Sequence, residues 1–312
     1  MDWMGELEEQ VRNRPLDHLA IPGSHNSFTY SLDKRSPVGP DEPGLMQKVA
    51  KLFGPLAKAI IYKWAVCQKL DATAQLSLGV RYFDFRLSKV SAVKQSKKHK
   101  DKDKEIKILH ALYGSPVNEI FKSIQSYLDD HGKEVVILDF QHFYGLDQVD
   151  LASLQHLVLQ HFQTKLCHFL DQVPSLAYLQ SRGLQVIIIC DYFYKICNAP
   201  WSWPRSSCPN PWANTTIPTD LEAFLMAGLR KRDTQRLFVS QAIFTLNLST
   251  LLRNPFSSLE KRLAEPCDKM ISSETLQQVR RSHLPLNIIM IDYVEKNDLV
   301  ASIIDFNNDF HS

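Results

Sequence analysis

The chain has 312 residues, 44% of them hydrophobic and 22% charged, with a formal net charge of +2. This composition is that of a folded globular protein, and the small net charge gives no reason to expect nucleic acid as a partner. No apolar run approaches the ~20 residues that a helix needs to span a bilayer. We expect one domain over residues 15–308, with a lead-in segment (1–14) before it and a short tail (309–312) after it.

The chain starts with an acidic segment, MDWMGELEEQ, and carries six scattered cysteines. The segment lacks the basic start and the apolar stretch of a signal peptide. The cysteines show no close pairs of the kind that bind zinc, and disulfide frameworks belong to short secreted chains. We therefore expect a cytoplasmic protein whose thiols are reduced.

Short apolar runs alternate with helical patterns along the chain. The predicted strands are residues 19–21, 80–87, 106–113, 135–140, 186–190, 236–243 and 287–294. Residues 118–132 show apolar side chains at helical spacing and end at Gly132, a residue type that commonly terminates helices. Near-continuous apolar strands separated by helices favour a parallel sheet with both faces covered. The sequence thus predicts an α/β fold, an irregular TIM-type (β/α) barrel, with the Pro- and Trp-rich residues 197–216 as a long rim loop.

Two segments allow more than one interpretation. Residues 45–66 form a predicted amphipathic helix with a break at Gly54-Pro55, and its lysines lie away from the apolar face. That face consists of Leu45, Val49, Leu52, Phe53, Leu56 and Ile60. Such a helix either packs on the barrel or lies on an anionic membrane surface. The lysine-rich residues 94–107, in a flexible loop expected over 91–105, are either a solvated loop or a docking site.

Polar residues stand at the ends of several predicted strands, which is where TIM-type barrels place their active sites. We expect Pro22-Gly23 to end the first strand and to raise His25 and Asn26 to the mouth of the barrel. The second strand carries Asp84 and Arg86 two residues apart, so both side chains point to the same face. The remaining strand ends supply His110, Asp139, Gln141, His142 and Asp292.

This set of side chains suits the cleavage of a phosphodiester, which needs a base, an acid and positive charge against the phosphate oxygens. Histidine titrates near neutrality and serves as either base or acid. The planar fork of arginine matches phosphate oxygens, and a carboxylate behind a histidine fixes its tautomer. Each residue alone also has a structural explanation, since a strand-end histidine is often part of the core and Asp84 with Arg86 could be a buried ion pair.

The motifs LAIPGSHNSFTY, QLSLGVRYFDFRL, ILHALYG and VVILDFQHFYG resemble, in this order, successive blocks of the phosphatidylinositol-specific phospholipase C X domain. The resemblance is to the small animal proteins that contain the X domain without the pleckstrin, EF-hand, Y and C2 parts of the large phospholipases. SPVGP (36–40), PWANTT (211–216) and residues 287–307 also resemble that subgroup. The resemblance covers residues 15–308, nearly the whole chain.

The resemblance implies a phospholipase C that cleaves the glycerol–phosphate bond of phosphatidylinositol lipids and touches the membrane peripherally. It makes His25 the base for the inositol 2-hydroxyl, Asp292 the carboxylate that orients this base, and His110 the acid for the diacylglycerol oxygen. The products would be diacylglycerol and inositol (cyclic) phosphate. The resemblance assigns supporting or substrate-binding roles to Asn26, Asp84, Asp139 and Gln141.

The second strand implies activity without a metal or other cofactor. Calcium-dependent members of the family carry Glu-x-Asp where this chain has Asp84-Phe85-Arg86, and a further Glu where it has Gln141. Calcium needs several anionic oxygens, and Arg86 would stand in its place and repel it, as in the bacterial enzymes. Those enzymes have Asp where this chain has Asn26, so we expect weaker activity unless Asp84 or Asp139 substitutes for that carboxylate.

Two other functions compete with this interpretation. A catalytically weak or silent phosphoinositide-binding or scaffold protein would retain the barrel, although binding alone does not need an acid–base pair. A glycerophosphodiester phosphodiesterase uses the same barrel but needs a His-Arg-Gly motif and paired metal-binding acids, and the sequence contains neither. The sequence favours no particular phosphoinositide and no particular oligomeric state.

Overall fold

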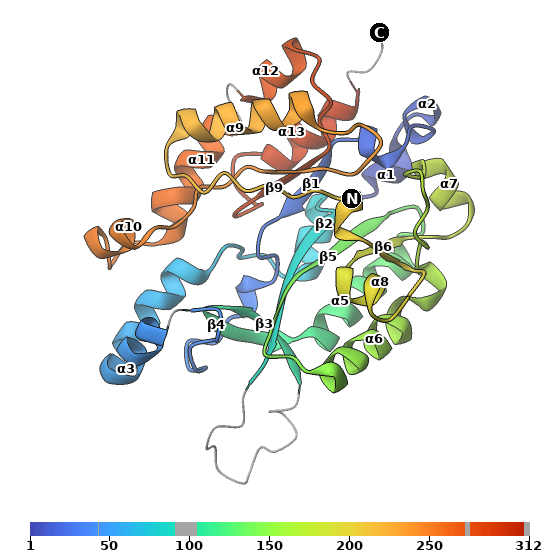
Figure 1. Ribbon diagram of the computed structural model, residues 1–312. Coiled ribbons are helices and arrows are strands. Elements are labelled where there is room, and N and C mark those ends of the chain that lie inside the picture. The colour runs from blue at the N-terminus through green and yellow to red at the C-terminus, as the bar shows by residue number, and fades with distance from the viewer. Residues whose placement is uncertain (43, 91–104, 272–274, 309–312) are drawn as a thin grey trace.

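The computed structural model describes residues 1–42, 44–90, 105–271 and 275–308, and gives the backbone alone for residues 44–53 and 248. A curled sheet forms its centre, and helices surround it (Figure 1). The strands are β1 (Ile21–Ser24), β2 (Tyr82–Lys89), β3 (Ile106–His110), β4 (Leu112–Pro116), β5 (Val136–Tyr144), β6 (Val186–Ile189), β7 (Ser202–Trp203), β8 (Val239–Gln241) and β9 (Ile288–Ile291). The main helices are α3 (Gly44–Ala65), α4 (Ala72–Leu78), α5 (Val117–Asp130), α6 (Gln148–Phe162), α7 (Leu176–Ser181), α8 (Asp191–Lys195), α9 (Pro218–Lys231), α10 (Leu248–Arg253), α11 (Glu265–Met270), α12 (Leu276–Arg281) and α13 (Leu299–Asp305).

The parallel part of the sheet follows the order β7-β6-β5-β2-β1-β9-β8 within the described residues. The two ends of this order are linked by the segment after β7, where Pro209 O accepts a hydrogen bond from Val239 N at 2.9 Å. A loop segment therefore completes the circle between β7 and β8. This arrangement is the irregular TIM-type barrel that the sequence predicts.

The predicted strand 106–113 is wrong, because it is a hairpin and not a barrel strand. β3 pairs antiparallel with the outer half of β2, and β4 pairs antiparallel with β3. The chain reverses at Ala111, whose φ is 59°. His110 therefore reaches the barrel mouth from a hairpin attached to β2 and not from a barrel strand. Its side chain still lines the same pocket as His25 and Asp292.

The prediction that Pro22-Gly23 ends the first strand is also wrong, because both residues lie inside β1. The proline is tolerated in this central strand because its lack of an N–H leaves no carbonyl at the start of β2 without a hydrogen bond. Arg81 N donates to Pro22 O at 2.9 Å, so the absent donor would point to Gly79 O, which accepts from Trp3 Nε1 instead. Glycine is required at position 23 because a Cβ there would lie 2.9 Å from Tyr82 Cδ1.

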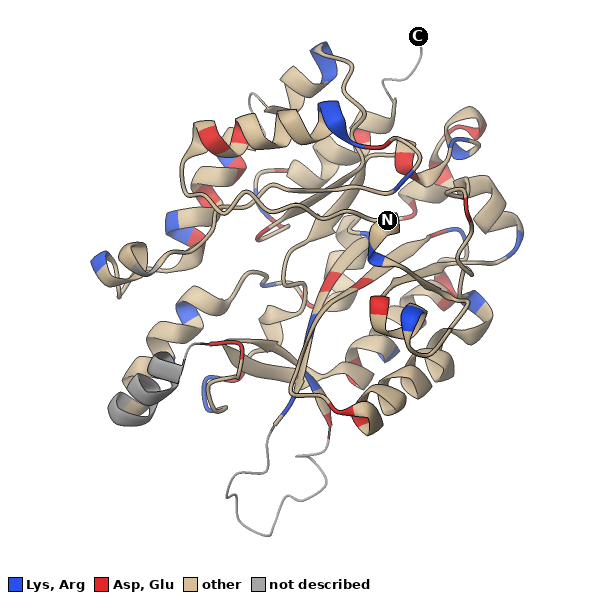
Figure 2. Cartoon of the chain, viewed as in Figure 1, with Lys and Arg blue, Asp and Glu red and all other residues tan. Residues whose placement is uncertain are grey.

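The alternation of side chains along β2 separates two buried layers. Phe83, Phe85 and Leu87 pack against the surrounding helices, whereas Tyr82 belongs to a second cluster inside the barrel. Asp84 and Arg86 share the inner face with Tyr82. Most other charged residues lie on the helices and loops around the sheet (Figure 2). The charged side chains of β2 at the predicted site, Asp84 and Arg86, therefore point into the barrel.

Helix α3 is kinked at Gly54, which has a φ of 54°, as the Gly54-Pro55 pair predicts. After this kink the buried positions differ from those predicted. Leu56 is 62% exposed, whereas Ala57, Ile61 and Trp64 are buried, because the non-helical residue shifts the face by one position. The residues of that face up to Phe53 lie outside the described side chains, and residues 91–104 of the lysine-rich segment lie outside the described chain.

Two segments that were expected to lie outside the barrel contribute to it. The lead-in residues form α1 (Trp3–Glu6) and α2 (Glu9–Arg12), whose Trp3 and Met4 are buried in the inner cluster. The predicted rim loop 197–216 contains β7, and its Trp203 is fully buried. In the described part of the chain no helix has the length and hydropathy needed to cross a membrane.

A fully buried ion pair joins several elements at the end of the barrel opposite the mouth. Arg81 Nη2 lies 2.6 Å from Glu134 Oε2, and neither side chain is exposed to solvent. The guanidinium also donates to Leu76 O and Val80 O, and Glu134 Oε1 accepts from Gly5 N. The pair therefore connects β2, α4, the strand β5 and the N-terminal helices.

Replacing Arg81 with Met should lower the free energy of unfolding by ~3–5 kcal/mol, because the carboxylate of Glu134 then stays buried without its partner. Urea denaturation followed by circular dichroism measures this loss. The double variant Arg81→Met/Glu134→Leu removes both charges and should recover much of it. An Arg81→Met protein that unfolds at the same urea concentration as the wild type would contradict this role of the pair.

Candidate active site

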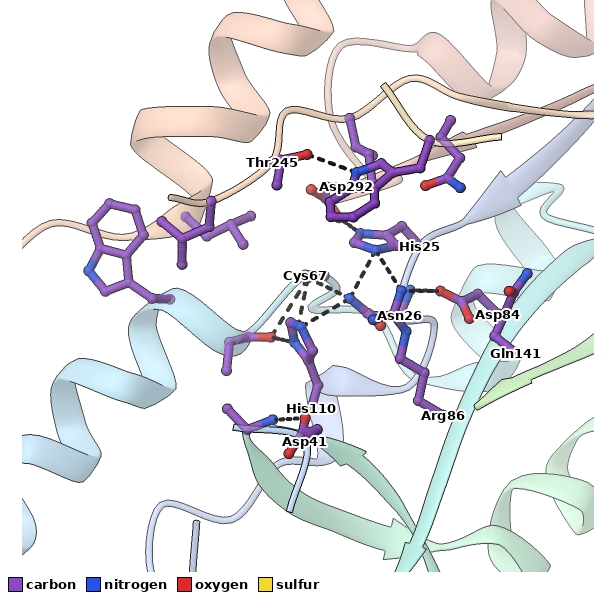
Figure 3. Close-up of a pocket in the computed structure, with 18 of the residues that line it drawn as sticks. His25, Asn26, Asp41, Cys67, Asp84, Arg86, His110, Gln141, Thr245 and Asp292 are labelled. Carbon is purple, nitrogen blue, oxygen red and sulfur yellow. Dashed lines mark hydrogen bonds and ion pairs between the residues drawn. The ribbon is translucent and has the colours of Figure 1, made fainter. Parts of the chain in front are cut away.

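A pocket of about 760 Å³ opens at the carboxyl ends of the barrel strands. Its polar floor brings together six of the eight sequence-predicted site residues (Figure 3). These six are His25, Asn26, Asp84, Arg86, His110 and Asp292. Gln141 is a seventh predicted residue that lines the pocket. Asp139 is the predicted residue that does not line it.

The hydrogen bonds of His25 fix the orientation of its ring. Its Nδ1 lies 2.8 Å from Asp292 Oδ1, and its Nε2 lies 3.0 Å from Asn26 Nδ2 and 3.4 Å from Arg86 Nη2. A carboxylate only accepts hydrogen bonds, whereas an amide NH₂ and a guanidinium only donate them. The Nδ1 atom therefore carries the proton, and the lone pair of Nε2 faces the pocket.

The amide of Asn26 joins the two histidines. Asn26 Nδ2 lies 3.0 Å from His25 Nε2 and 3.3 Å from His110 Nε2, so one NH₂ group faces the lone pairs of both rings. His110 Nδ1 donates to Ala65 O at 2.7 Å, which fixes this ring in its Nδ1–H tautomer. The second ring is therefore also neutral, and burial, followed by the charge of Arg86, lowers the pKa of His110 to about 3.

Arg86 supplies the positive charge of the floor. Its Nη2 lies 3.6 Å from Asp84 Oδ2 and 3.4 Å from His25 Nε2. The same Asp84 oxygen accepts from Asn26 N at 3.0 Å, so this carboxylate holds both the guanidinium and the backbone next to the base. Asp84 is thus the acid beside Arg86, as the sequence allowed.

The segment Val66–Gln68 braces the two strand ends that carry His25 and Asp292. Gln68 Nε2 donates to His25 O at 3.0 Å and to Ile291 O at 2.9 Å. Tyr293, which follows Asp292, donates from its N to Cys67 O and from its hydroxyl to Val66 O. This brace fixes the distance between the base and its carboxylate.

Three residues of the site have a positive φ, a conformation that costs energy for residues other than glycine. They are Asn26 itself (44°), Ala111 after His110 (59°) and Tyr293 after Asp292 (49°). Ala111 is held by Asp41, whose Oδ2 accepts from Ala111 N at 2.7 Å. Strained backbone thus accompanies each of the two histidines and the carboxylate.

Asp139 belongs to a separate polar network below the floor. Its Oδ2 accepts from Tyr82 OH at 2.6 Å, from Gln141 Nε2 at 2.6 Å and from Arg205 Nη1 at 2.7 Å. Burial raises the pKa of Asp139 to about 6, although Arg205 opposes this shift. The ion-pair partner of Asp139 is Arg205, whereas that of Arg86 is Asp84, so the geometry favours Asp84 for the role of the carboxylate missing at Asn26.

A bulge in β5 brings two consecutive side chains to the pocket. The pairing of β2 with β5 shifts between Phe85 and Arg86, so that Arg86 stands opposite His142. One extra residue in a strand turns neighbouring side chains toward the same side. Gln141 and His142 both line the pocket as a result.

One wall of the pocket is apolar. It is formed by Ile61, Trp64, Phe244, Leu246, Leu251 and Leu259. Ile61 and Trp64 lie on α3. The other four lie on the stretch that follows β8, and Leu251 among them belongs to α10. This wall stands beside the charged floor, so the pocket offers both polar and apolar surface to a ligand.

Sequence analysis missed several residues of the site. Asp41 and Cys67 line the pocket, and Arg205 holds Asp139 from below. Tyr82 had a signal, because it shares the two-residue spacing of Asp84 and Arg86 on β2. The other three lie in irregular segments where residue spacing gives no information about direction.

The arrangement has the parts that acid–base chemistry at a phosphate requires. An imidazole whose Nε2 lone pair faces the pocket can serve as a base, and a carboxylate behind it stabilises the imidazolium that forms. A guanidinium 3.4 Å from that lone pair is positioned for an anionic oxygen.

Comparisons with known proteins agree on one family. No protein-family model matches the chain. It is 36% identical over 317 residues to mouse PI-PLC X domain-containing protein 3, covering 99% of this chain and 94% of that protein. It is 38% identical over 266 residues to human PI-PLC X domain-containing protein 2, covering 84% and 83% of the two chains, and 31% identical over 307 residues to human PI-PLC X domain-containing protein 1, covering 98% and 92%.

Solved structures show the same fold at lower sequence similarity. The phosphatidylinositol-specific phospholipase C from Listeria monocytogenes superposes with a TM-score of 0.63 at 14% identity, covering 99% of this chain and 98% of that one. A Staphylococcus aureus phosphatidylinositol-specific phospholipase C gives a TM-score of 0.64 at 15% identity, covering 97% and 96%. These likenesses confirm the irregular TIM-type barrel. The mouse protein is 36% identical to this chain over nearly its whole length, and the chain therefore belongs to the family of PI-PLC X domain-containing proteins.

Proposed function

We propose that this protein is a phosphoinositide phospholipase C that works without a metal ion and cleaves the glycerol–phosphate bond of phosphatidylinositol. The observation that carries this proposal is the state of His25, whose Nδ1 is tied to Asp292 and whose Nε2 lone pair faces the pocket beside Arg86. The names of the similar proteins, which refer to phosphatidylinositol phospholipases, support the same substrate class.

In the proposed reaction His25 Nε2 takes the proton of the inositol 2-hydroxyl, and that oxygen attacks the neighbouring phosphorus. The bond from phosphorus to the glycerol oxygen breaks, and this oxygen leaves as diacylglycerol after it takes a proton from His110. Arg86 stabilises the charge on the phosphate oxygens. The attack is intramolecular, so little entropy is lost in reaching the transition state.

The neutral state of His110 adds a condition to its role as the acid. The ring must first gain a proton at Nε2, and a phosphodiester anion beside Arg86 favours this because it offsets the guanidinium charge. Asn26 must then turn, since its NH₂ group cannot face an N–H. Its Oδ1, which has no hydrogen-bond partner among the described residues, would accept from the imidazolium.

The donor set of the floor supports a reaction without calcium. Calcium binds several oxygens, most of them from carboxylates. Here Asp84 Oδ2 is 3.6 Å from Arg86 Nη2, so a cationic side chain already lies beside the acid that would be the first ligand. The positive charge that calcium gives to other members of the family would come from Arg86.

The rest of the pocket suits a lipid with an unphosphorylated inositol. Asp41, Glu42, Asp84 and Asp292 line it, and Arg86 is its one Lys or Arg within the described chain. Inositol hydroxyls donate to carboxylates, whereas further phosphate groups would be repelled by them. The apolar wall would face the glycerol side of the substrate. Large apolar side chains on the segments that carry this wall are exposed, namely Leu56 (62%), Leu252 (66%) and Phe256 (76%).

Replacing His25 or His110 with Ala should each lower the release of diacylglycerol from phosphatidylinositol by ~10²–10⁴-fold, because each change removes one proton-transfer group. His168→Ala, which changes an exposed histidine outside the pocket, is the matched control and should keep wild-type activity. Diacylglycerol release from mixed micelles measures this. Binding of phosphatidylinositol without release by the wild-type protein would favour the silent scaffold instead.

A panel of phosphoinositides in mixed micelles, with and without EDTA, tests the metal and headgroup proposals together. We expect turnover to be unchanged by EDTA, because Arg86 provides the charge, and to be faster for phosphatidylinositol than for its phosphorylated forms. Strict dependence on calcium would overturn the role of Arg86. Equal or faster turnover of the phosphorylated lipids would overturn the headgroup preference.

His110 should remain neutral at pH ~5 in the free protein, since its lowered pKa lies well below the ordinary value for histidine. Addition of inositol 1-phosphate should raise this pKa, and so should Asn26→Asp, because both place negative charge next to the ring. Nuclear magnetic resonance of the ring nitrogens, assigned with His110→Gln, measures the titration. If the His110 ring titrates at the ordinary pKa of histidine in the free protein, this account of His110 is contradicted. The role of Asn26 is tested separately by activity: an Asn26→Asp variant that releases no more diacylglycerol than the wild type would contradict it.

A further inference from the structure

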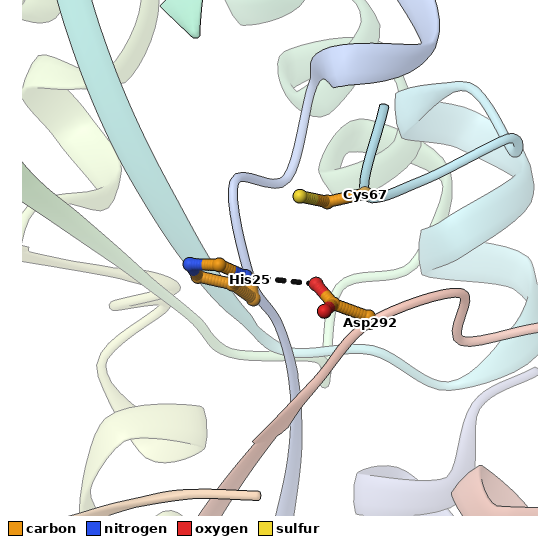
Figure 4. Close-up of side chains that lie close together, drawn as sticks. All are labelled: His25, Cys67 and Asp292. Atoms are coloured by element: carbon orange, nitrogen blue, oxygen red, sulfur yellow. Dashed lines mark hydrogen bonds and ion pairs between the residues drawn. The ribbon is translucent and has the colours of Figure 1, made fainter. Parts of the chain in front are cut away.

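Cys67 lies in the floor of the pocket but has no part in the proposed reaction. Its Sγ, one ring nitrogen of His25 and one carboxylate oxygen of Asp292 all lie within 4.8 Å of one another (Figure 4). The three residues come from separate segments, namely the end of β1, the brace Val66–Gln68 and the end of β9. Within the described residues this is the one group of three side chains with metal-binding atoms so close together.

We propose that His25, Cys67 and Asp292 form a binding site for a thiophilic divalent ion of the zinc type, and that the bound ion switches off the base. The ion is a regulator or inhibitor in this proposal and takes no part in the reaction. The site is distinct from the calcium position of the family, which involves the residues around Asp84 and Arg86.

The chemistry of the three ligands selects this type of ion. One thiolate, one imidazole and one carboxylate match zinc, which binds sulfur at ~2.3 Å and nitrogen or oxygen at ~2.0–2.2 Å. Calcium and magnesium prefer oxygen ligands and gain nothing from the sulfur. Tetrahedral ligands at these bond lengths lie ~3.3–3.7 Å apart. The three atoms lie within 4.8 Å of one another, and His25 Nδ1 and Asp292 Oδ1 are 2.8 Å apart, so an ion would require small rotations of these side chains to reach ligand spacing.

The surroundings hold the ligands in place before an ion arrives. Cys67 is fully buried, and its backbone is fixed by Thr29 Oγ1 and by Tyr293, the neighbour of Asp292. Asn26 Nδ2 lies 3.5 Å from Cys67 Sγ. Cys67 is among the residues that line the pocket, so an ion would approach it from the mouth. On binding, the thiol proton leaves to solvent and the Zn–S bond forms in its place.

Metal binding removes the base whichever nitrogen of His25 takes part. If Nε2 binds the ion, its lone pair is no longer free for the substrate hydroxyl. If Nδ1 binds the ion, the ring proton moves to Nε2, because a neutral imidazole carries one proton. This consequence for activity rests on the proposed function of His25, whereas metal binding itself does not.

Cobalt(II) is a direct probe of the site, because a thiolate ligand gives it a charge-transfer absorption band in the near ultraviolet. Titration of the reduced, chelator-treated protein with cobalt should produce this band, and zinc should displace it. Cys67→Ala and Cys67→Ser should both lose the band while keeping a wild-type circular dichroism spectrum. Cys197→Ser, which changes a more exposed cysteine outside the pocket, should keep it. A wild type without the band, or Cys67 variants that retain it, would overturn the proposal.

Inhibition provides the second arm of the test. Zinc should reduce the release of diacylglycerol by the wild-type protein, and a chelator should restore it. Relative to its own activity without zinc, Cys67→Ala should require at least ~10-fold more zinc for the same inhibition, since loss of a direct ligand weakens metal binding at least as much as loss of an outer partner. Equal sensitivity of the two proteins would overturn the inhibitory role. A cobalt band in a wild type that cleaves no lipid would refute the proposed function and leave the metal site standing.

Discussion

The parallel pairing of β1 with its two neighbours is the constraint on which the site depends. Ser24 stands opposite Ile291 on β9 and opposite Phe83 on β2. One residue further along, the same register places His25 beside Asp292 and Asp84. His25, Asp292 and Asp84 are therefore brought together by the backbone pairing of the three strands. Gly23 makes this close packing possible, because a side chain there would collide with Tyr82.

Hydrogen bonding then determines the charge state of the floor. Asn26 offers one NH₂ group to both imidazole rings, and the carbonyl of Ala65 holds the second ring in its neutral tautomer. An aspartate in place of Asn26 would favour protonated rings. Asn26 therefore does more than take away one partner of Arg86, because its amide contacts both rings. The same amide lies beside Cys67, which links the acid–base pair to the proposed zinc site.

Much of the fold was predictable because strands and helices have different periods. The alternation in VRYFDFRL places Asp84 and Arg86 on one face and Phe83, Phe85 and Leu87 on the other, and the structure keeps this division. The helix 118–132 corresponds closely to α5. The errors fall where a single residue reverses or shifts the chain. Ala111 turns a predicted strand into a hairpin, and Gly54 kinks α3. Both effects come from the backbone conformation of one residue, which leaves no repeating pattern in the sequence.

The sequence by itself determined the barrel and the positions of the two histidines, Arg86 and Asp292 near the ends of its strands. Only the tertiary structure decided how these groups relate to one another. It set Arg205 against Asp139, placed Cys67 beside His25 and Asp292, and joined the two rings through Asn26. The physical reason is that strand spacing fixes the direction of a side chain along one element. Charge state and ligand geometry depend on atoms from segments that are far apart in the chain and meet only when the barrel closes.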